Sequence, residues 1–248
     1  MSTTEPVRSG KANVRDWTLR VVDSGDAEPN MQRVTFTCDD IAEFNYQPGQ
    51  AIVFFMTLPN GETGRRHYTI RSIDRDAGTF AVDFLKHGAS PATDWARAAK
   101  PGDTIAAKGP RGSAKFDASA NWHLLSGDET CIPAFAHMLE TMPAGAKVFA
   151  FIEVNDAEGE IAIDTKADAK IVWVHRNGTA AGPNDLMLAT IEAFALPEGL
   201  GRAIIIGETS NVRRQRHALI ARGMAREQIS SEGYWRPDRV GGHDHVDD

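Results

Sequence analysis

The run RRHYTIR, residues 65–71, contains the residue types that a flavin site needs. Such a site requires a cation for the cofactor's pyrophosphate, an aromatic ring against the isoalloxazine, and a hydroxyl near its reactive edge. Arg66, Tyr68 and Thr69 supply these types in that order. In a strand, alternation places Arg66 and Tyr68 on one face, and His67 and Thr69 on the other. Taken alone, the segment fits an exposed basic edge strand equally well.

The segment KHGASPATDW follows a strand pattern and has the signature of a helix start. Gly88 permits a tight turn, Ser90 is a favourable N-cap, and Pro91 is a favourable first helical residue. Because free N–H groups at a helix start bind anions, the amides of residues 89–93 and the Thr93 hydroxyl could support a diphosphate. A well-capped helix without a ligand is the alternative.

Two polar segments, SGDET at 126–130 and GET at 207–209, each follow an apolar stretch and precede a helical pattern. In a doubly wound fold, ligands bind outside the carboxyl ends of the strands, so these segments could meet a nicotinamide dinucleotide. Gly127 would let the dinucleotide approach. Glu208 could bond the carboxamide, or be a favourable acid at a helix N-terminus. The Rossmann fingerprint GxGxxG is absent from the first segment.

Charged residues that close the next two strand patterns bear on the choice between NADH and NADPH. Glu153 and Asp156 end one pattern, and an acid at this place usually meets a ribose hydroxyl and repels a 2′-phosphate. This favours NADH. His175 and Arg176 end the following pattern and could instead bind that phosphate.

The first half of the chain has the pattern of a closed antiparallel β-barrel. Six short segments rich in β-branched and aromatic residues are separated by turn sequences that contain Gly, Pro, Asn or Asp. Close spacing of this kind is typical of a barrel. The predicted strands are 17–22, 33–38, 51–58, 67–73, 79–85 and 104–108, and one helix is predicted near 91–99.

After residue 120, apolar strands alternate with helical patterns, which indicates a parallel sheet with crossover helices. We predict strands at 123–126, 147–154, 171–175 and 202–207, and helices at 132–142, 185–195 and 212–222. The sequence therefore predicts an N-terminal antiparallel β-barrel domain over 14–118 and a C-terminal α/β domain over 119–239.

The end of the chain combines an aromatic and basic run with a polar tail. The run GYWRPDR, residues 233–239, contains two large aromatic residues and two arginines. Its aromatic residues would either cover a bound flavin or anchor the tail. Residues 240–248 are polar, and we predict that they form a disordered tail.

The composition restricts the possible partners and locations. The 248 residues carry a formal net charge of −7, which argues against nucleic acid as a partner. The two cysteines have no metal-binding spacing, so no metal site is expected. The N-terminal residues lack the apolar core of a signal peptide, and the longest apolar runs are too short to span a bilayer. We expect a cytoplasmic monomer that does not bind a membrane.

Together these segments resemble the siderophore-interacting protein family, a branch of the ferredoxin–NADP reductase superfamily that includes ferric-siderophore reductases. The resemblance covers about residues 17–239. Its matching pieces, in the family's order, are RRHYTIR, VDFLKHGASPATDWA, PGDTIAAKGPRG, WHLLSGDETCIPA, FIEVND, WVHRNG, GETSNVRRQR and GYWRPDR. The resemblance implies an FAD-binding barrel and an NAD(P)H-binding α/β domain. It also implies that electrons pass from NAD(P)H through FAD to a ferric siderophore, which releases Fe(II).

The resemblance also implies site residues, carried over by motif. FAD would be held by Arg66, His67, Tyr68, Thr69, His87, Gly88, Ala89, Ser90 and Thr93. The nicotinamide cofactor would face Asp128, Glu129, Thr130 and Glu208. The ferric siderophore would meet Lys86, Arg111, Lys115, Arg236 and Arg239. No side chain is assigned as a catalytic acid or base, because FAD would carry the chemistry. Many family members have an acidic residue where this chain has Ala89.

Two other functions remain open. An oxidoreductase of the same architecture could reduce a different acceptor, such as a free flavin, a quinone or a ferredoxin, because fold does not determine function. A siderophore-binding protein without catalytic activity could retain a vestigial flavin site. The intact RRHYT and GDET segments count against the second alternative.

Overall fold

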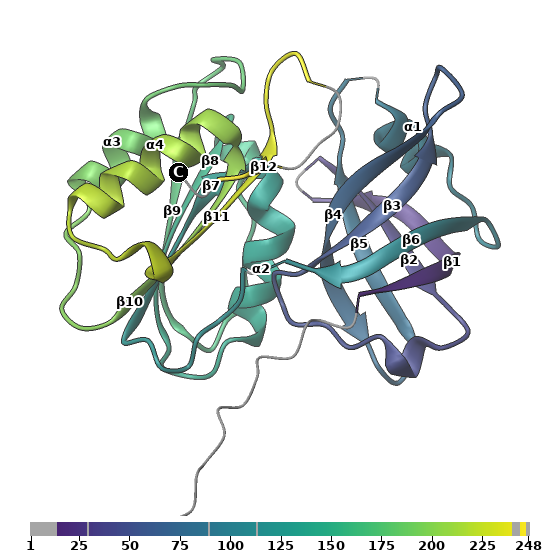
Figure 1. Ribbon diagram of the computed structural model, residues 1–248, viewed down its shortest axis with the longest axis horizontal. Coiled ribbons are helices and arrows are strands. Elements are labelled where there is room, and N and C mark those ends of the chain that lie inside the picture. The colour runs from purple at the N-terminus through teal and green to yellow at the C-terminus, as the bar shows by residue number, and fades with distance from the viewer. Residues whose placement is uncertain (1–13, 29, 89, 113, 240–243, 247–248) are drawn as a thin grey trace, which may run out of the picture.

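The structure is a computed structural model, and it describes residues 14–28, 30–88, 90–112, 114–239 and 244–246. An N-terminal β-barrel and a C-terminal α/β domain lie side by side, with helix α2 (Ile132–Thr141) between the α/β sheet and the barrel (Figure 1). The predicted fold class is confirmed. None of the helices in the described ranges is long and apolar enough to cross a membrane.

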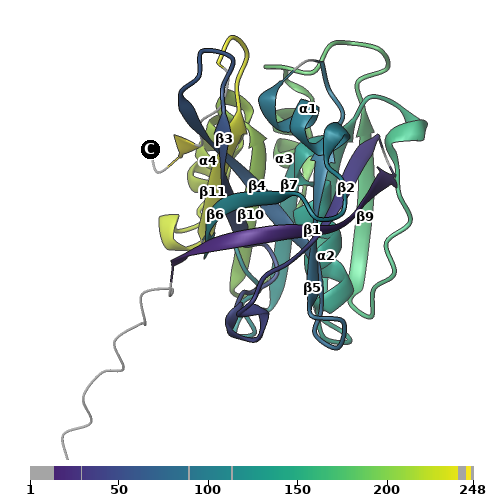
Figure 2. The same cartoon turned by 90° about the vertical axis from the view of Figure 1, so that its right-hand side faces the viewer.

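The barrel closes because its first strand pairs antiparallel with both the second and the sixth. The order around the barrel is β1-β2-β5-β4-β3-β6. Figure 2 looks onto the barrel and shows β1 crossing in front of the other strands. The elements are β1 (Arg15–Ala27), β2 (Met31–Thr37), β3 (Ala51–Thr57), β4 (Thr63–Asp74), β5 (Thr79–Leu85), β6 (Thr104–Arg111) and helix α1 (Pro91–Ala98).

Alternating apolar side chains fill the barrel. Phe36, Phe54, Phe80 and Phe84 are at most 1% exposed, and the Phe36 ring centroid lies 5.4 Å from that of Phe54. Helix α1 adds its apolar face to the same cluster. Strands β1 and β4 run beyond their predicted ranges because the polar residues at their ends still pair with the neighbouring strand.

The α/β domain contains five parallel strands and a short antiparallel edge strand, in the order β12-β11-β10-β7-β8-β9. The order reverses between β7 and β10, which is the place where doubly wound sheets bind ligands. Helices α3 and α4 cover the face opposite α2 (Figure 1). The elements are β7 (Trp122–Asp128), β8 (Lys147–Val154), β9 (Asp168–His175), α3 (Leu186–Ala193), β10 (Gly201–Glu208), α4 (Thr209–Ala221), β11 (Ile229–Trp235) and β12 (Asp244–His245).

The C-terminal part of the chain differs from its prediction in two ways. Strand β11 was not predicted, because its sequence ISSEGYW mixes polar residues and glycine and has no apolar run; it pairs with β10 through backbone hydrogen bonds. The disordered tail predicted over 240–248 is wrong at residues 244–246. There β12 pairs with β11, and Val246 is 1% exposed in the sheet core. Residues 240–243, 247 and 248 lie outside the described part of the chain.

Helix α2 connects the two domains. One buried cluster contains α2 residues together with Met31 and Ala114 from the N-terminal half. Arg71 of β4 forms a bidentate salt bridge with Glu140 of α2, with both N···O distances 2.7 Å. This contact fixes the barrel strand that carries the predicted flavin residues against the α/β domain.

Candidate cofactor and substrate site

Arg66 of β4 has a buried hydrogen-bond donor that the rest of the described chain does not satisfy. Its Nη1 donates to the carbonyl oxygen of Arg65 at 2.9 Å, whereas its Nη2 is buried and has no partner among the described residues. Leaving a buried charged donor unpaired is costly, and a phosphate oxygen is the acceptor that a guanidinium matches best. This orphaned atom fits the pyrophosphate of FAD.

The next residues of β4 face alternate sides of the strand. Tyr68 packs toward the barrel core, with its ring centroid 4.2 Å from that of Phe84, and burial raises the pKa of its phenol. Thr69 is 4% exposed and faces the other domain, where its hydroxyl lies 3.2 Å from the Tyr234 hydroxyl of β11. His67 is half-buried and, by alternation, shares the face of Thr69.

The polar side chains at the start of α1 bond chiefly to each other. The Ser90 hydroxyl accepts from the Thr93 backbone N–H at 3.2 Å and lies 3.0 Å from the Thr93 hydroxyl. Thr93 is fully buried, so its side chain supports the turn rather than facing outward. His87 and Gly88 are exposed just before the helix, and Ala89 lies outside the described residues. The side-chain hydrogen bonds of this segment are therefore those of a well-capped helix, the alternative that needs no ligand.

Asp128, at the end of β7, joins three segments of the α/β domain. Its Oδ1 accepts hydrogen bonds from the backbone N–H of Thr130, at 3.0 Å, and from the hydroxyl of the same residue. Its Oδ2 accepts from the Glu208 N–H at 2.7 Å and from the Trp235 indole N–H at 2.9 Å. Burial raises the pKa of Asp128, and these hydrogen bonds oppose the shift. Both carboxylate oxygens are engaged within the protein.

Two glycines allow the ends of β7 and β10 to approach each other closely. A Cβ on Gly127 would lie 2.1 Å from the Ile206 carbonyl oxygen. Gly207 has a φ of +146°, and a Cβ there would lie 2.5 Å from Asp128 Oδ2. A side chain on Gly127 would therefore point at the neighbouring strand. Glycine at this position lets β7 and β10 pack closely where the strand order reverses.

Glu208 is the N-cap of α4. Its Oε2 accepts hydrogen bonds from the backbone N–H of Asn211, at 2.9 Å, and from the Ser210 hydroxyl, and the residue is 2% exposed. The sequence left two roles open for Glu208, a ligand of the carboxamide or a favourable acid at a helix N-terminus. The hydrogen bonds of its side chain are those of the second role. The helix begins at Thr209, before the predicted range, because Glu208 caps it.

The acids and the arginine at the ends of β7, β8 and β9 form one buried cluster. Arg176 is 6% exposed, and its Nη1 lies 2.8 Å from Glu129 Oε2 and 3.3 Å from Glu153 Oε1. Asn184 donates to the same Glu153 oxygen, while Oε2 of Glu153 is buried with no partner in the described part of the chain. Burial raises the pKa of Glu153. The guanidinium is thus held by two carboxylates.

Three of the predicted substrate cations are paired with acids. Arg239 Nη1 lies 2.6 Å from Asp244 Oδ1, and Arg236 Nη1 lies 3.9 Å from Asp244 Oδ2. Lys86 Nζ lies 2.6 Å from Asp26 Oδ1 at the end of the β1–β2 hairpin. Asp244 could not be predicted as a partner of these cations, because nothing in a short polar tail indicates that it folds back onto β11.

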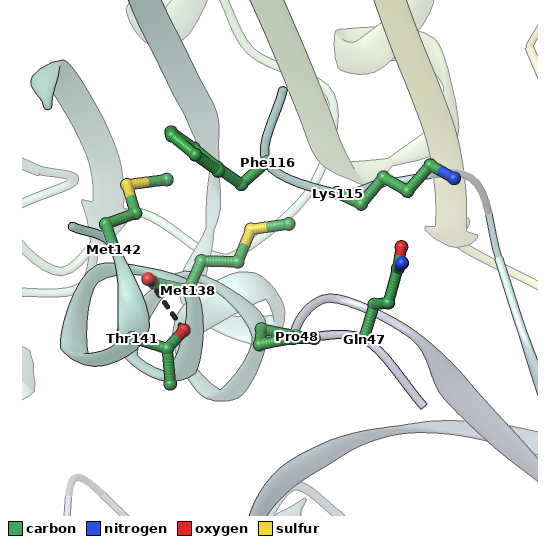
Figure 3. Close-up of a pocket in the computed structure, with 7 residues that line it drawn as sticks. All are labelled: Gln47, Pro48, Lys115, Phe116, Met138, Thr141 and Met142. Atoms are coloured by element: carbon green, nitrogen blue, oxygen red, sulfur yellow. Dashed lines mark hydrogen bonds between the residues drawn. The ribbon is translucent and has the colours of Figure 1, made fainter. Parts of the chain in front are cut away.

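The other two predicted cations lie elsewhere. Arg111 is exposed and pairs in register with Ala51, which in turn pairs with Thr69, so it lies two strands, about 10 Å, from Thr69. Lys115 lines a cavity of about 360 Å³ at the C-terminal end of α2 (Figure 3). The rest of its lining is Gln47, Pro48, Phe116, Met138, Thr141 and Met142.

The structure brings some predicted residues together and separates others. The Thr69–Tyr234 contact places β4 of the barrel beside the carboxyl end of β11, and Trp235 then reaches Asp128. Lys115 lies at the far end of α2, about 15 Å along a ten-residue helix from the Asp128 edge. The predicted cations therefore do not form a single cluster.

Two families of known proteins match this chain, each over part of its length. The siderophore-interacting FAD-binding domain matches residues 56–114, and the siderophore-interacting protein family matches residues 120–238. The first range contains β4, β5, α1 and β6, and the second contains the five parallel strands β7 to β11 with their helices.

Individual relatives give the same result. The ferric vibriobactin reductase ViuB of Vibrio cholerae is 31% identical over 230 residues, which cover 84% of each chain. A siderophore utilization protein from T. fusca is 32% identical, with a TM-score of 0.83 and coverage of 94% of this chain and 96% of that one. A ferredoxin reductase of carbazole 1,9a-dioxygenase shares the fold, at 18% identity and a TM-score of 0.65, over 87% of this chain and 68% of that one. The chain belongs to the siderophore-interacting protein family and carries its FAD-binding domain.

Proposed function

We propose that this protein is an FAD-dependent ferric-siderophore reductase that takes its electrons from a nicotinamide cofactor. The observation that carries the proposal is the buried, unpaired Nη2 of Arg66, on the strand whose next residues reach the sheet edge. A resident anionic group at this place would satisfy that donor. The name of the Vibrio cholerae relative supports ferric-siderophore reduction as the activity.

The chain's own residues would bind and position the reacting molecules. Arg66 would hold the FAD pyrophosphate, and Tyr68 and Thr69 would border the isoalloxazine. His67 lies between Arg66 and Tyr68 on β4, and His87 and Gly88 follow β5, the strand that pairs with β4. The bound FAD would supply the redox chemistry that links a two-electron nicotinamide donor to one-electron reduction of ferric iron. Ferrous iron binds oxygen ligands more weakly than ferric iron, so reduction would release it for use. No residue needs to act as an acid or base.

We propose NADH as the preferred donor. The 2′-phosphate of NADPH would need a free cation near the end of β8 or β9. Arg176 follows the end of β9, and it already forms salt bridges with Glu129 and Glu153. A dianionic phosphate would therefore meet an arginine whose charge is compensated, next to the buried Glu153 carboxyl. Asp128 and Glu208 would act on the dinucleotide indirectly, by fixing the two strand ends and the start of α4.

The first experiment is anaerobic reduction of a ferric siderophore by the FAD-loaded protein, with NADH or NADPH as donor and a ferrous chelator as the readout. We expect Fe(II) when protein, FAD and donor are all present, at a higher rate with NADH. Omission of each component in turn is the control. If NADH reduces the flavin but no Fe(II) forms, the protein is still a flavin-dependent oxidoreductase, and its electron acceptor is another molecule, such as a quinone or a ferredoxin.

A further inference from the structure

Two guanidinium groups and one hydroxyl, that of Thr209, lie around the carboxylate of Asp244. The Thr209 hydroxyl is also 3.1 Å from the Trp235 carbonyl oxygen. Arg239 Nη1 lies 2.6 Å from Oδ1, the Thr209 hydroxyl lies 3.1 Å from Oδ2, and Arg236 Nη1 lies 3.9 Å from Oδ2. Burial alone would raise the pKa of Asp244, but the hydrogen bonds from Arg239 and Thr209 and the charge of Arg236 outweigh it and lower that pKa. Two guanidinium groups and a hydroxyl thus form a site that already binds one carboxylate.

The backbone builds this site from separate segments. Thr209 is the first residue of α4, a thirteen-residue helix whose N-terminus favours an anion. β12 holds the carboxylate in place, since Asp244 pairs with Gly233 of β11 and Val246 is buried behind it. The anion site therefore lies at the surface of the α/β domain on residues that its folded sheet and helix hold in place, and its occupant is a residue of the same chain.

The site lies beside the proposed path of electrons. Trp235, immediately before Arg236, donates its indole N–H to Asp128 at the carboxyl edge of the sheet. Tyr234, one residue earlier, contacts Thr69 on the flavin strand of the barrel. Figure 1 shows the yellow C-terminal segment at the end of the α/β domain that faces the barrel. Arg236 and Arg239 remain 52% and 39% exposed at their side chains, so a molecule in solution can reach them.

We propose that Asp244 is an internal competitor for the substrate's acidic groups, and that an anionic ferric chelate must displace its carboxylate from Arg236, Arg239 and Thr209. The inference rests on the proposed function for the identity of the ligand. Asp244 then sets the charge selectivity of the enzyme. Its carboxylate already occupies the site between the two arginines, so every anionic chelate binds more weakly. It also reduces the net positive charge that a cationic chelate would meet.

The test measures binding without electron transfer, using gallium(III) in place of iron because gallium is not reduced under these conditions. Two probes are titrated against the FAD-loaded protein and followed by tryptophan fluorescence: an anionic gallium tris-catecholate, and a cationic gallium trihydroxamate that carries an ammonium group. The variants are Asp244→Asn and the matched control Asp238→Asn. The control removes the same charge nearby, at an exposed position whose φ of +62° suits asparagine.

We expect Asp244→Asn to bind the anionic probe roughly three- to tenfold more tightly than the wild type, the gain from removing one partly exposed competing ion pair. Asp238→Asn should stay within about twofold of the wild type. Arg239→Gln, which removes a donor instead of the competitor, should weaken the anionic probe in both the wild-type and the Asp244→Asn background. Neither Asp244→Asn nor Asp238→Asn should tighten binding of the cationic probe.

Two outcomes would overturn the inference: equal affinities of Asp244→Asn and Asp238→Asn for the anionic probe, or tighter binding of both probes by Asp244→Asn. These outcomes are independent of the reductase proposal. If the wild type reduces ferric chelates while Asp244→Asn fails to tighten binding, only the role of Asp244 is wrong. If Asp244→Asn tightens the gallium probe while no ferric chelate is reduced, the anion site stands and the reductase assignment falls.

Discussion

Strand β4 of the barrel and the carboxyl edge of the α/β sheet both carry residues with cofactor-binding chemistry, and the two regions differ in how far these residues are satisfied. On β4, Nη2 of Arg66 is buried without a partner among the described residues. At the sheet edge, both oxygens of Asp128 accept internal hydrogen bonds, and Arg176 is held by two carboxylates. The buried atom of Glu153 that has no partner among the described residues, Oε2, is an acceptor and offers nothing to a phosphate.

This difference matches two kinds of ligand. An unpaired buried donor is tolerable when a resident group satisfies it nearly all the time, as a tightly held FAD would. A region whose cation and buried aspartate are already paired within the protein is stable when empty, which suits a dinucleotide that arrives and leaves in every turnover. We therefore expect substitutions on β4 to affect flavin retention, and substitutions at the sheet edge to affect folding and donor choice.

The largest expected effect is that of Asp128→Ala on stability. The change removes the acceptor for the Glu208 N–H and the Trp235 indole, as well as for Thr130, all in a buried place. We expect the free energy of unfolding to fall by about 4 kcal/mol, measured by urea denaturation. Asp156→Ala, which removes a half-buried cap of a short helical turn, is the control and should cost less than about 1 kcal/mol. An equal loss in the two variants would show that Asp128 is not a structural hub.

The next effect separates the barrel from the sheet edge. Arg66→Ala should weaken FAD binding by about 3 kcal/mol, roughly 100-fold, because it removes a charge-assisted hydrogen bond to phosphate in a buried site. The unfolding free energy of the FAD-free protein should fall by less than about 1 kcal/mol, since Nη2 has no partner in the described chain to lose and Nη1 loses one exposed bond to the Arg65 carbonyl oxygen. FAD retention is measured by absorbance after desalting. Arg65→Ala, at the exposed neighbouring position, is the control. A variant at Arg66 that keeps its flavin would remove the central support for the proposed function.

The sequence predicted the elements whose patterns are local. All six barrel strands and four of the five parallel strands were predicted, because β-branched and aromatic runs between turn residues do not depend on distant contacts. Strand β11 was missed because ISSEGYW becomes a strand only through pairing with β10. The same limit applies to β12, whose pairing with β11 depends on the completed sheet.

The candidate site also combines features that could be predicted from local sequence with features that depend on distant contacts. The residue types at Arg66, Tyr68 and Thr69 could be read from one strand, and alternation predicted that Tyr68 and Thr69 face opposite sides. The partners of Asp128 and of Arg176 could not be predicted, because they come from strands that become neighbours only through the order β11-β10-β7-β8-β9. Sequence reasoning therefore found residues with ligand-binding chemistry, and the strand order decided which of them were already paired.

A pH-dependent effect tests a contact between helix α2 and the N-terminal half of the chain. His137 of α2 is 5% exposed, and its Nε2 lies 2.6 Å from the hydroxyl of Tyr46 in the N-terminal half. Burial, together with the charge of Arg71, lowers the pKa of His137 to about 4 from 6.5, although Glu140 opposes the shift. Because the unfolded chain binds the proton more readily, stability is lost as the pH falls from about 6.5 toward 4, and no further loss from this group occurs below that.

Between pH 7 and pH 5, His137 should account for a loss of about 2 kcal/mol in the free energy of unfolding. The measurement is urea denaturation at both pH values, for the wild type and for His137→Gln, whose side chain does not titrate but can still bond to Tyr46. Subtracting the two pH profiles removes the contribution of the other titrating groups. Parallel profiles would mean that His137 takes up its proton as easily in the folded protein as in the unfolded chain.

The smallest expected effect concerns the choice of donor at the sheet edge. Glu129→Gln removes one of the two carboxylates that hold Arg176 and leaves its guanidinium more available to a 2′-phosphate. The preference for NADH over NADPH, measured as the ratio of kcat/KM values for flavin reduction, should fall about three- to tenfold, in line with one partly exposed ion pair. Binding of adenosine fragments with and without the 2′-phosphate gives a readout that does not depend on turnover. Glu158→Gln, an exposed acid in the turn after β8, is the matched control for net charge. If Glu158→Gln changes the ratio as much as Glu129→Gln, donor choice follows the overall charge of this edge, and the pairing of Arg176 does not determine it.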